Sequence, residues 1–209
     1  MDNLSTGSFD FVTPKAKFMK RSSFLKLGLA FGSFVISSFK IHASAKTKHQ
    51  DSKGFKVDAG KDRFDKSISL FEGDTFYTKV STKDTDGGMY VFESTRIKEG
   101  GPILHTHYYT NEWWYVLQGE FLIKVGDKTY NAKAGDFVFG PRMVPHTFAK
   151  IGKGEAKVMI CHQPAGKMEE YFKKISEGVA TNMSEAERND LRKEHGFEKV
   201  GPPLSYLKQ

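Results

Sequence analysis

The stretch HTHYYTNEWWYVLQG, residues 105–119, decides the fold of this chain. It holds His105 and His107 one residue apart, Glu112 after four more residues, and Gly119 after a further six. In a β-strand, residues i and i+2 project from the same face, about 6.6 Å apart, so both imidazoles can lean toward one ion. In a helix the same pair would lie about 200° apart around the axis. The spacing therefore predicts β-structure.

A second block, GDFVFGPRMVPH, covers residues 135–146 and adds His146 after Gly135 and Pro141. Three imidazoles and one carboxylate form a borderline ligand set suited to Fe, Mn, Co, Ni, Cu or Zn. The sequence therefore predicts one divalent transition metal ion and leaves its identity open. The candidate metal ligands are His105, His107, Glu112 and His146.

The two blocks together resemble the motifs of the cupins. The first cupin motif runs glycine, five residues, His-x-His, three or four residues, Glu, six residues, glycine. The second runs glycine, five residues, Pro-x-Gly, two residues, His, three residues, Asn. The 15 residues between Gly119 and Gly135 match the short spacer of compact single-domain members. The resemblance covers residues 65–165 and implies a metal-binding β-barrel.

Three positions depart from the cupin pattern. Gly100 and Gly101 stand closer to the first histidine than the motif glycine does, Met143 replaces the glycine of the second motif, and Lys150 replaces its asparagine. None of these is a ligand position, so the predicted metal site is unaffected.

Hydrophobic periodicity points to the same fold independently. Short apolar-alternating runs lie between turn residues, without helices between them, which is typical of an antiparallel sandwich or barrel. We expect an all-β, antiparallel double-stranded β-helix (the cupin jelly-roll barrel) with short C-terminal helices. The expected strands are 68–71, 75–81, 89–97, 103–107, 112–118, 120–125, 128–132, 136–139, 146–151 and 156–162.

Four segments follow from these patterns. The C-terminal segment is expected to contain helices over 168–177 and 184–195, because Ser184 and Glu187 form a capping box and Gly196 is a typical helix stop. The segments are an export signal (1–45), a flexible polar linker (46–64), a cupin barrel (65–165) and a C-terminal helical extension (166–209).

The export signal rests on a basic stretch, an apolar run of 13 residues over 27–39, and Ala43-Ser44-Ala45 as a cleavage site. We expect cleavage after Ala45 and a periplasmic or secreted protein. The segment from Arg21 to Lys26 resembles a twin-arginine signal with Ser22 in place of the second arginine, so the Sec and twin-arginine routes both stay open. The alternative is an uncleaved N-terminal anchor, and translation could begin at Met1 or Met19.

Charge and cysteine content narrow the partners. The formal net charge is +7, of which the first 45 residues contribute +4. The remaining excess of positive charge is too small to indicate nucleic-acid binding. After cleavage we expect no stable membrane insertion.

The one cysteine, Cys161, cannot form an internal disulfide. It is expected to be a small buried side chain, with a role as a soft metal ligand as the alternative.

Strict alternation along 112–118 places Trp114 and Val116 on the face of Glu112, with Trp113, Tyr115 and Leu117 pointing outward. Exposed Trp113 and open strand edges indicate a homodimer. The aromatic-rich residues near the ligands are expected to include some that wall a cavity around the ion. These residues are Phe121, Phe137, Phe139, Met143 and Phe148.

Such a cavity would suit a flat aromatic or enediol substrate. Arg96 and Arg142 are the only arginines near the motifs, and no pair for phosphate is evident. Within the cupins, the segments 112–119 and 135–141 most resemble small quercetinase-like proteins. This resemblance implies a dioxygenase that uses O₂, with Glu112 as a metal ligand or as a catalytic base for a substrate hydroxyl.

Two other functions stay open. One is a non-catalytic exported protein that binds a metal or small ligand, because the fold alone does not decide activity. The other is an isomerase or epimerase, which would need a second acid or base facing the site. Tyr108 and Tyr115 are the candidates for that residue.

Overall fold

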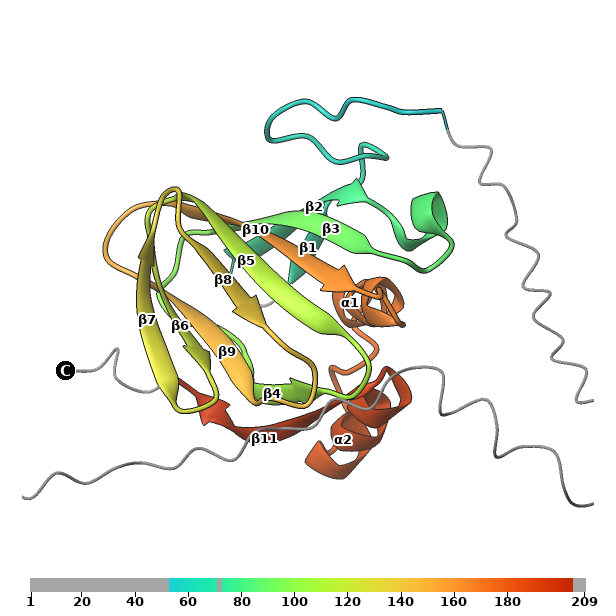
Figure 1. The fold of residues 1–209 in the computed structure, drawn as a ribbon. Helices are drawn as coiled ribbons and strands as arrows, with labels where there is room; N and C mark the ends of the chain where they lie inside the picture. Colours follow the sequence, from blue (N-terminus) through green and yellow to red (C-terminus); the bar gives the residue numbers. More distant parts are fainter. Residues whose placement is uncertain (1–52, 71–72, 205–209) are drawn as a thin grey trace, which may run out of the picture. The chain divides into compact units, whose positions relative to one another are not determined.

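The computed structural model describes residues 53–70 and 73–204 (Figure 1). The predicted export signal, its cleavage site and the first part of the predicted linker lie outside these residues. Within them, no helix combines the length and the apolar character needed to cross a membrane.

Eleven strands form two antiparallel sheets in this part of the chain (Figure 1). The six-stranded sheet has, in spatial order, β1 (Ile68–Leu70), β2 (Asp74–Val80), β3 (Tyr90–Arg96), β10 (Ala156–Gln163), β5 (Asn111–Gln118) and β8 (Phe137–Gly140). The five-stranded sheet has β11 (Phe197–Pro203), β4 (Ile103–His107), β9 (His146–Ile151), β6 (Glu120–Val125) and β7 (Lys128–Lys133).

The predicted fold class is confirmed. All ten expected strands are present with ends within one residue of the predicted ones. Both expected helices are present as α1 (Met168–Ser176) and α2 (Glu185–Glu194), and the capping box at Ser184 forms. A short 3₁₀ helix, Thr82–Thr85, was not expected.

The core lies between the two sheets because each strand turns alternate apolar side chains inward. On β5, the residues Glu112, Trp114 and Val116 are buried while Tyr115 and Leu117 are exposed, which confirms the predicted alternation. Trp113, which was expected to be exposed, is half-buried. Burying a side chain of this size contributes about 2–3 kcal/mol. The largest fully buried apolar side chains are Trp114, Tyr90, Phe92, Phe121, Ile123, Ile160, Val116 and Val158.

Gly119 is the corner at which the chain leaves the six-stranded sheet and enters the five-stranded one between β5 and β6. Its φ of 74° is a left-handed conformation that suits glycine. A Cβ there would lie 2.6 Å from Cβ of Ala156, so there is also no room for a side chain. A side chain at position 119 would therefore disturb the turn that connects β5, the strand of Glu112, to β6.

The prediction of a helical C-terminal extension was incomplete, because the extension also contains a strand. After α2 the chain forms β11, which pairs antiparallel with β4 at the edge of the five-stranded sheet. Helix α1 is fixed to the barrel by Glu169, whose carboxylate accepts hydrogen bonds from Ser81 Oγ (2.9 Å) and Thr82 N (2.7 Å). Both α1 and β11 of this extension are therefore hydrogen-bonded to the barrel.

The end of the predicted flexible linker is also attached to the barrel. Asp62 is buried, and its carboxylate accepts hydrogen bonds from the backbone N–H groups of Thr78 (2.6 Å) and Phe64 (2.8 Å). The adjacent Arg63 N–H donates to the Thr78 carbonyl oxygen at 2.7 Å. Ordered structure therefore begins before the predicted boundary at residue 65.

Candidate metal centre

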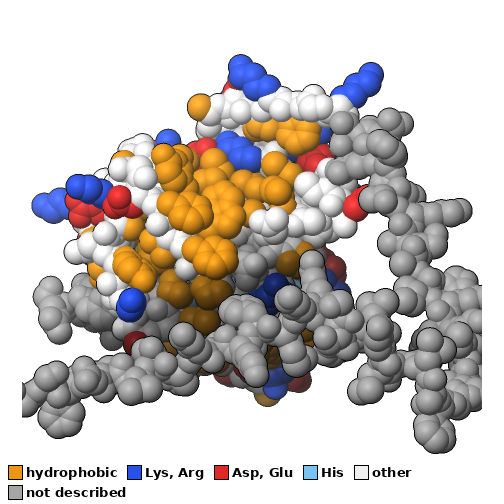
Figure 2. All heavy atoms as spheres, in the orientation of Figure 1, with side chains coloured by type: hydrophobic (Ala, Val, Ile, Leu, Met, Phe, Trp, Pro, Cys, Tyr) orange, Lys and Arg blue, Asp and Glu red, His pale blue; other side chains and the backbone are white. Residues whose placement is uncertain are grey.

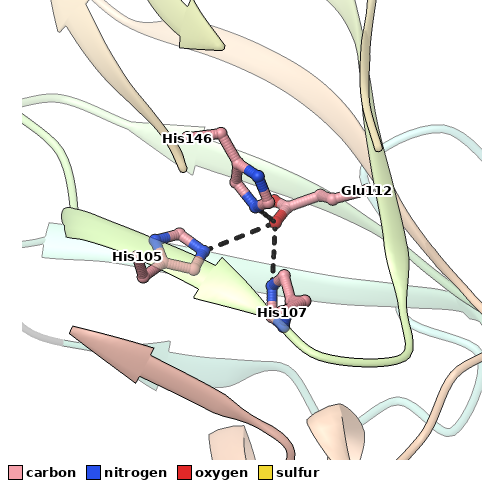
Figure 3. Close-up of side chains that lie close together, drawn as sticks. All are labelled: His105, His107, Glu112 and His146. Carbon is pink, nitrogen blue, oxygen red and sulfur yellow. Dashed lines mark hydrogen bonds and ion pairs between the residues drawn. The ribbon is translucent and has the colours of Figure 1, made fainter. Parts of the chain in front are cut away.

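The four predicted ligands lie together inside the barrel (Figure 3). His105 and His107 lie on β4, Glu112 on β5 and His146 on β9. His105 and His146 are direct cross-strand partners. One ligand atom from each of the four residues lies within 4.8 Å of every other, and all four residues are buried. The i, i+2 spacing on β4 thus brings the His105 and His107 rings into the same cluster.

The Oε2 atom of Glu112 lies at the centre of the cluster. It is 3.2 Å from Nε2 of His107, 3.2 Å from Nε2 of His146 and 3.6 Å from Nε2 of His105. Three imidazole nitrogens thus converge on one carboxylate oxygen, as the dashed lines in Figure 3 show.

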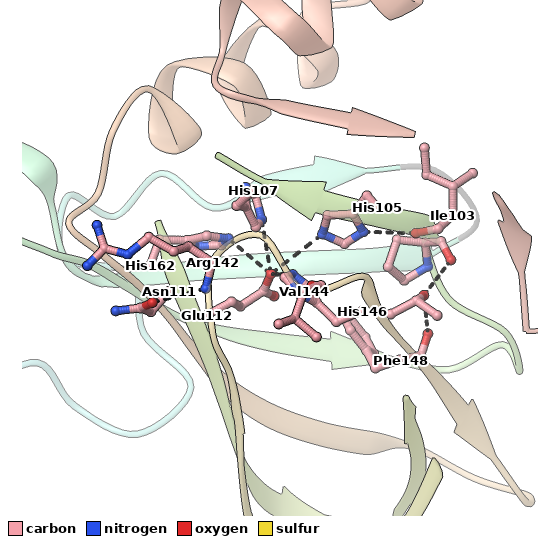
Figure 4. Close-up of polar contacts among 12 residues, drawn as sticks. Ile103, His105, His107, Asn111, Glu112, Arg142, Val144, His146, Phe148 and His162 are labelled. Atoms are coloured by element: carbon pink, nitrogen blue, oxygen red, sulfur yellow. Dashed lines mark hydrogen bonds and ion pairs between the residues drawn. The ribbon is translucent and has the colours of Figure 1, made fainter. Parts of the chain in front are cut away.

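The other ring nitrogens identify the proton positions on two of these histidines. Nδ1 of His105 lies 2.9 Å from the Ile103 carbonyl oxygen, and Nδ1 of His146 lies 2.8 Å from that of Val144 (Figure 4). A carbonyl can only accept, so each Nδ1 carries the proton and each Nε2 is left with a lone pair in the neutral ring.

A lone pair on Nε2 and a carboxylate oxygen repel each other unless a cation lies between them. The cation can be a proton or a metal ion. Backbone carbonyls that fix the Nδ1–H tautomer are the usual outer partners of metal-binding histidines. The donor set and its hydrogen bonds therefore fit a divalent transition metal ion.

Burial sets the charge of this cluster. It lowers the pKa of His105, and it lowers the pKa of His107 to about 3, because a charged ring is poorly solvated there. Burial alone would raise the pKa of Glu112, but its electrostatic interaction with His162 and its contacts with the other three histidines hold it well below its usual value. Neutral imidazoles around an ionised carboxylate are the protonation states that metal binding requires.

A fifth residue, His162 on β10, belongs to the same cluster and was missed by the sequence analysis. It is fully buried, and its Nε2 lies 3.5 Å from Oε2 of Glu112 (Figure 4). Its Nδ1 has no hydrogen-bond partner among the described residues. The ring stacks on Phe92, with centroids 5.9 Å apart. The alternation of β10, which places His162 in line with Ile160, was the available signal.

A cavity of about 320 Å³ adjoins the cluster, and His105, Glu112 and His162 form part of its wall. The rest of the wall is mainly apolar and comes from both sheets, from α1 and from β11. The aromatic lining residues are Phe76, Phe92, Phe148, Tyr171, Phe172 and Phe197.

The sequence predicted that some of five residues near the ligands line the cavity, and one of them does. Phe148 lines the cavity, whereas Phe121 is buried in the core away from it. Phe137, Phe139 and Met143 are more than half exposed. β8 is an edge strand whose Val138 and Gly140 turn toward the barrel, so its two phenylalanines must face outward.

The two tyrosines considered as a second acid or base do not line the cavity. Tyr115 is exposed on the outer face of β5, and Tyr108 lies after the end of β4. The tyrosine that does line it is Tyr171 on α1. This placement removes the specific support for an isomerase or epimerase.

The arginines also differ from expectation. Arg96 lines the cavity, but Arg142 does not, and Arg192 of α2 is a second lining arginine that the sequence did not indicate. Arg96 pairs with Asp74, with Nη1 and Oδ2 2.7 Å apart. Arg192 Nη1 lies 3.2 Å from Oε1 of Glu185. Each arginine thus already has a carboxylate partner.

Cys161 is buried, as predicted, and burial raises the pKa of its thiol to about 11. It is not part of the metal-ligand cluster found in the described residues. Met143, which replaces the motif glycine, has a φ of 62°, the left-handed conformation for which glycine is suited. Lys150, which replaces the motif asparagine, is buried and donates to the Gly152 carbonyl oxygen.

Comparison with known proteins gives the same assignment. Residues 94–162 match the cupin domain family Cupin_2. A segment of 62 residues is 32% identical to the uncharacterized protein MJ1618 of Methanocaldococcus jannaschii, covering 30% of this chain and 50% of that protein. The match therefore spans half the length of that relative.

Solved structures with a similar arrangement include KdgF from Halomonas sp. (15% identity, 54% of this chain and 94% of that one, TM-score 0.46). Others are an RmlC-like cupin from Shewanella frigidimarina (18% identity, 57% and 98%, TM-score 0.45) and a predicted oxalate decarboxylase from Thermotoga maritima (19% identity, 47% and 90%, TM-score 0.42). Residues 94–162 thus match a cupin domain, and the two motifs and the paired antiparallel sheets agree with this match.

Proposed function

We propose that this protein is a metal-dependent dioxygenase of the quercetinase-like type, acting with O₂ on a small aromatic or enediol substrate. The observation that carries the proposal is a buried cluster of three histidines and one glutamate set in the wall of an apolar, aromatic-lined cavity. Pockets of this kind enclose flat apolar ligands and use a few polar groups to orient them.

The residues would divide the work as follows. His105, His107 and His146 would hold the ion through Nε2, with the tautomers of His105 and His146 fixed by backbone carbonyls. A bound transition metal ion supplies Lewis-acid and one-electron chemistry at this position. Glu112 would be a ligand or would accept the proton of a substrate hydroxyl at Oε2.

His162 would keep that carboxylate in place, because its Nε2 lies 3.5 Å from Oε2 of Glu112 on the side of β10. The aromatic walls would exclude bulk water from the reacting atoms. Water exclusion strengthens each electrostatic interaction inside the site.

The first test is the metal content of the purified protein. We expect close to one Fe, Mn, Co, Ni or Cu ion per chain, lost in His146→Ala. His195→Ala is the matched control, since His195 is also a buried histidine but is held by α2 through its Nδ1 and the Leu191 carbonyl oxygen, 2.7 Å apart. Absence of metal after reloading the wild-type protein would refute the proposal.

The second test is oxygen uptake with flavonols and catechols. As a base, Glu112 should matter more for turnover than for metal content, so Glu112→Gln should lower oxygen uptake by about 100-fold or more while keeping most of the metal. Loss of metal and activity together would show that Glu112 is simply a ligand.

A second candidate is a non-catalytic protein that binds a metal and a small ligand. It is favoured by the pairing of the cavity's other charged groups, since Asp74 binds Arg96 and Glu185 binds Arg192. Zinc alone in the purified protein, with flavonol binding but no oxygen uptake, would support this candidate over the enzyme.

We also propose an exported, periplasmic or secreted protein, with cleavage after Ala45, and a homodimer. The dimer is supported by apolar side chains gathered over the face where β5 and β8 lie (Figure 2). Exposed there are Tyr115, Leu117, Phe137 and Phe139. N-terminal sequencing of the purified protein tests the cleavage site.

A further inference from the structure

The cavity beside the metal cluster contains a second polar group that the proposed reaction does not use. Asp74 on β2 and Arg96 on β3 are cross-strand partners, and both line the cavity. Arg96 Nη1 donates to Asp74 Oδ2 at 2.7 Å, and Ser94 Oγ donates to Oδ1 at 2.7 Å. All three residues are more than nine-tenths buried.

Arg96 has donors to spare. A guanidinium carries five N–H groups, and the carboxylate of Asp74 engages Nη1. Nε of Arg96 is buried without a hydrogen-bond partner in the part of the chain that the structure describes. On one side the guanidinium lies near Phe148, with 5.7 Å between Cζ and the ring centroid. Because Nε is enclosed by protein, the donors that Arg96 can offer to a ligand in the cavity are those on its Nη atoms.

The charge of the pair selects the kind of acceptor. Asp74 and Arg96 together are neutral, so a carboxylate or phosphate would gain from the arginine but be repelled by the aspartate. A hydroxyl can accept from Arg96 and donate to Asp74 at the same time. The pair therefore favours a hydroxyl over an anion.

The position of the pair sets the length of the ligand. Phe92 stacks on His162 in the metal cluster, and Arg96 lies four residues further along the same strand. At 3.3 Å per residue, Phe92 and Arg96 are about 13 Å apart along β3. The side chains of α1 close the space between them, with Phe172 5.5 Å from Phe92 between ring centroids. A flat molecule of two or three rings spans such a distance, whereas a single catechol ring does not.

We propose that Asp74 and Arg96 form a second binding subsite, which holds a hydroxyl at the far end of an elongated aromatic substrate whose other end reaches the metal cluster. This inference rests on the proposed function and adds to it a requirement for a hydroxyl at the end of the substrate remote from the metal cluster. The pair acts by positioning and selecting the substrate, not by taking part in the reaction.

The test compares two ligands that differ by one hydroxyl, 3-hydroxyflavone and 3,4′-dihydroxyflavone. Their dissociation constants are measured by fluorescence titration of the metal-loaded, full-length protein without oxygen, so that no turnover occurs. The 4′-hydroxyl should tighten binding about 10- to 100-fold, the usual effect of a hydrogen bond to a charged group. This comparison uses the wild-type protein and so does not depend on a variant that folds.

A double variant, Asp74→Leu with Arg96→Met, then removes both charges together, since leaving one of them unpaired would destabilise the fold. In this variant the two flavones should bind with equal affinity. Thermal unfolding of the double variant checks that it folds.

Each outcome decides something. Equal binding of both flavones to the wild type would overturn the subsite while leaving the proposed function intact. A preference for the hydroxyl that survives in the double variant would also overturn it. A 4′-carboxylate analogue that binds more tightly than the hydroxyl would show an anion site instead. Failure of either flavone to bind would refute the substrate class of the proposed function, and the subsite with it.

Discussion

Metal binding to this cluster should displace about one proton. His146 donates its Nδ1 proton to the Val144 carbonyl oxygen at 2.8 Å, so its Nε2 has only a lone pair when the ring is neutral. That Nε2 nevertheless lies 3.2 Å from Oε2 of Glu112. A proton between the two atoms would satisfy this contact in the metal-free cluster, and the metal ion takes the place of that proton.

The magnitude follows directly. One proton released makes the apparent dissociation constant of the metal fall about tenfold for each unit of pH, or about 1.4 kcal/mol. His105 and His107 should add little, because burial lowers the pKa of both and they are already neutral. The predicted slope is therefore near one, not three.

Calorimetric titration with Zn²⁺ in two buffers of different ionisation enthalpy counts the protons. Glu112→Gln is the matched variant, since the amide NH₂ of glutamine can donate to Nε2 of His146 without a bound proton. We expect release to fall from about one proton to near zero in this variant, even though its metal affinity is lower. No release from the wild type, or equal release from both proteins, would refute the reasoning.

Three further predictions concern stability and assembly. The stability that neutral His107 contributes to the metal-free protein should be fully present above pH 6.5 and be lost as the pH falls toward 3, because burial lowers the pKa of His107 from 6.5 to about 3; urea unfolding at pH 7, 5 and 4 would contradict this if the midpoints agreed. Gly101→Ala should cost about 3 kcal/mol or more, since the new Cβ would lie 1.7 Å from the Phe148 carbonyl oxygen; Gly54→Ala, which meets nothing within 4 Å, is the control in thermal unfolding. Phe137→Asp should convert a dimer to a monomer in analytical ultracentrifugation, and an unchanged mass would place any dimer contact elsewhere.

The strands and the cluster of three histidines and Glu112 were predictable because both depend on local spacing. Alternation along β5 placed Glu112, Trp114 and Val116 on the inner face, and the structure confirms it. The His-x-His pair needed only a strand to bring both rings to one side. Such features can be predicted without knowledge of what each strand packs against.

β11 was missed for a physical reason. Its sequence contains Gly201, Pro202 and Pro203, which weaken a strand prediction because proline cannot donate to the hydrogen-bond ladder. β11 lies at the edge of the five-stranded sheet, where that missing donor is tolerated. The register shift beside Gly201 in its pairing with β4 accommodates the irregular backbone.

The remaining site residues depend on contacts between strands that are distant in sequence. His162 follows Glu112 by 50 positions, yet β10 and β5 are neighbours, and these two residues are cross-strand partners. Asp74 and Arg96 are separated by 22 positions and meet only because β2 and β3 pair. A single histidine or arginine outside a motif gives no local sign of such a partner.

The cluster draws its residues from both sheets. Glu112 and His162 come from the six-stranded sheet, while the three other histidines come from the five-stranded one. An ion held among them would tie the sheets together. At a free metal concentration 100 times the dissociation constant it would add about 2.7 kcal/mol of stability. A catalytic ion and a purely structural one would stabilise the protein equally. Thermal stabilisation by metal therefore tests only whether the site binds, whereas oxygen uptake by Glu112→Gln at equal metal content tests whether it reacts.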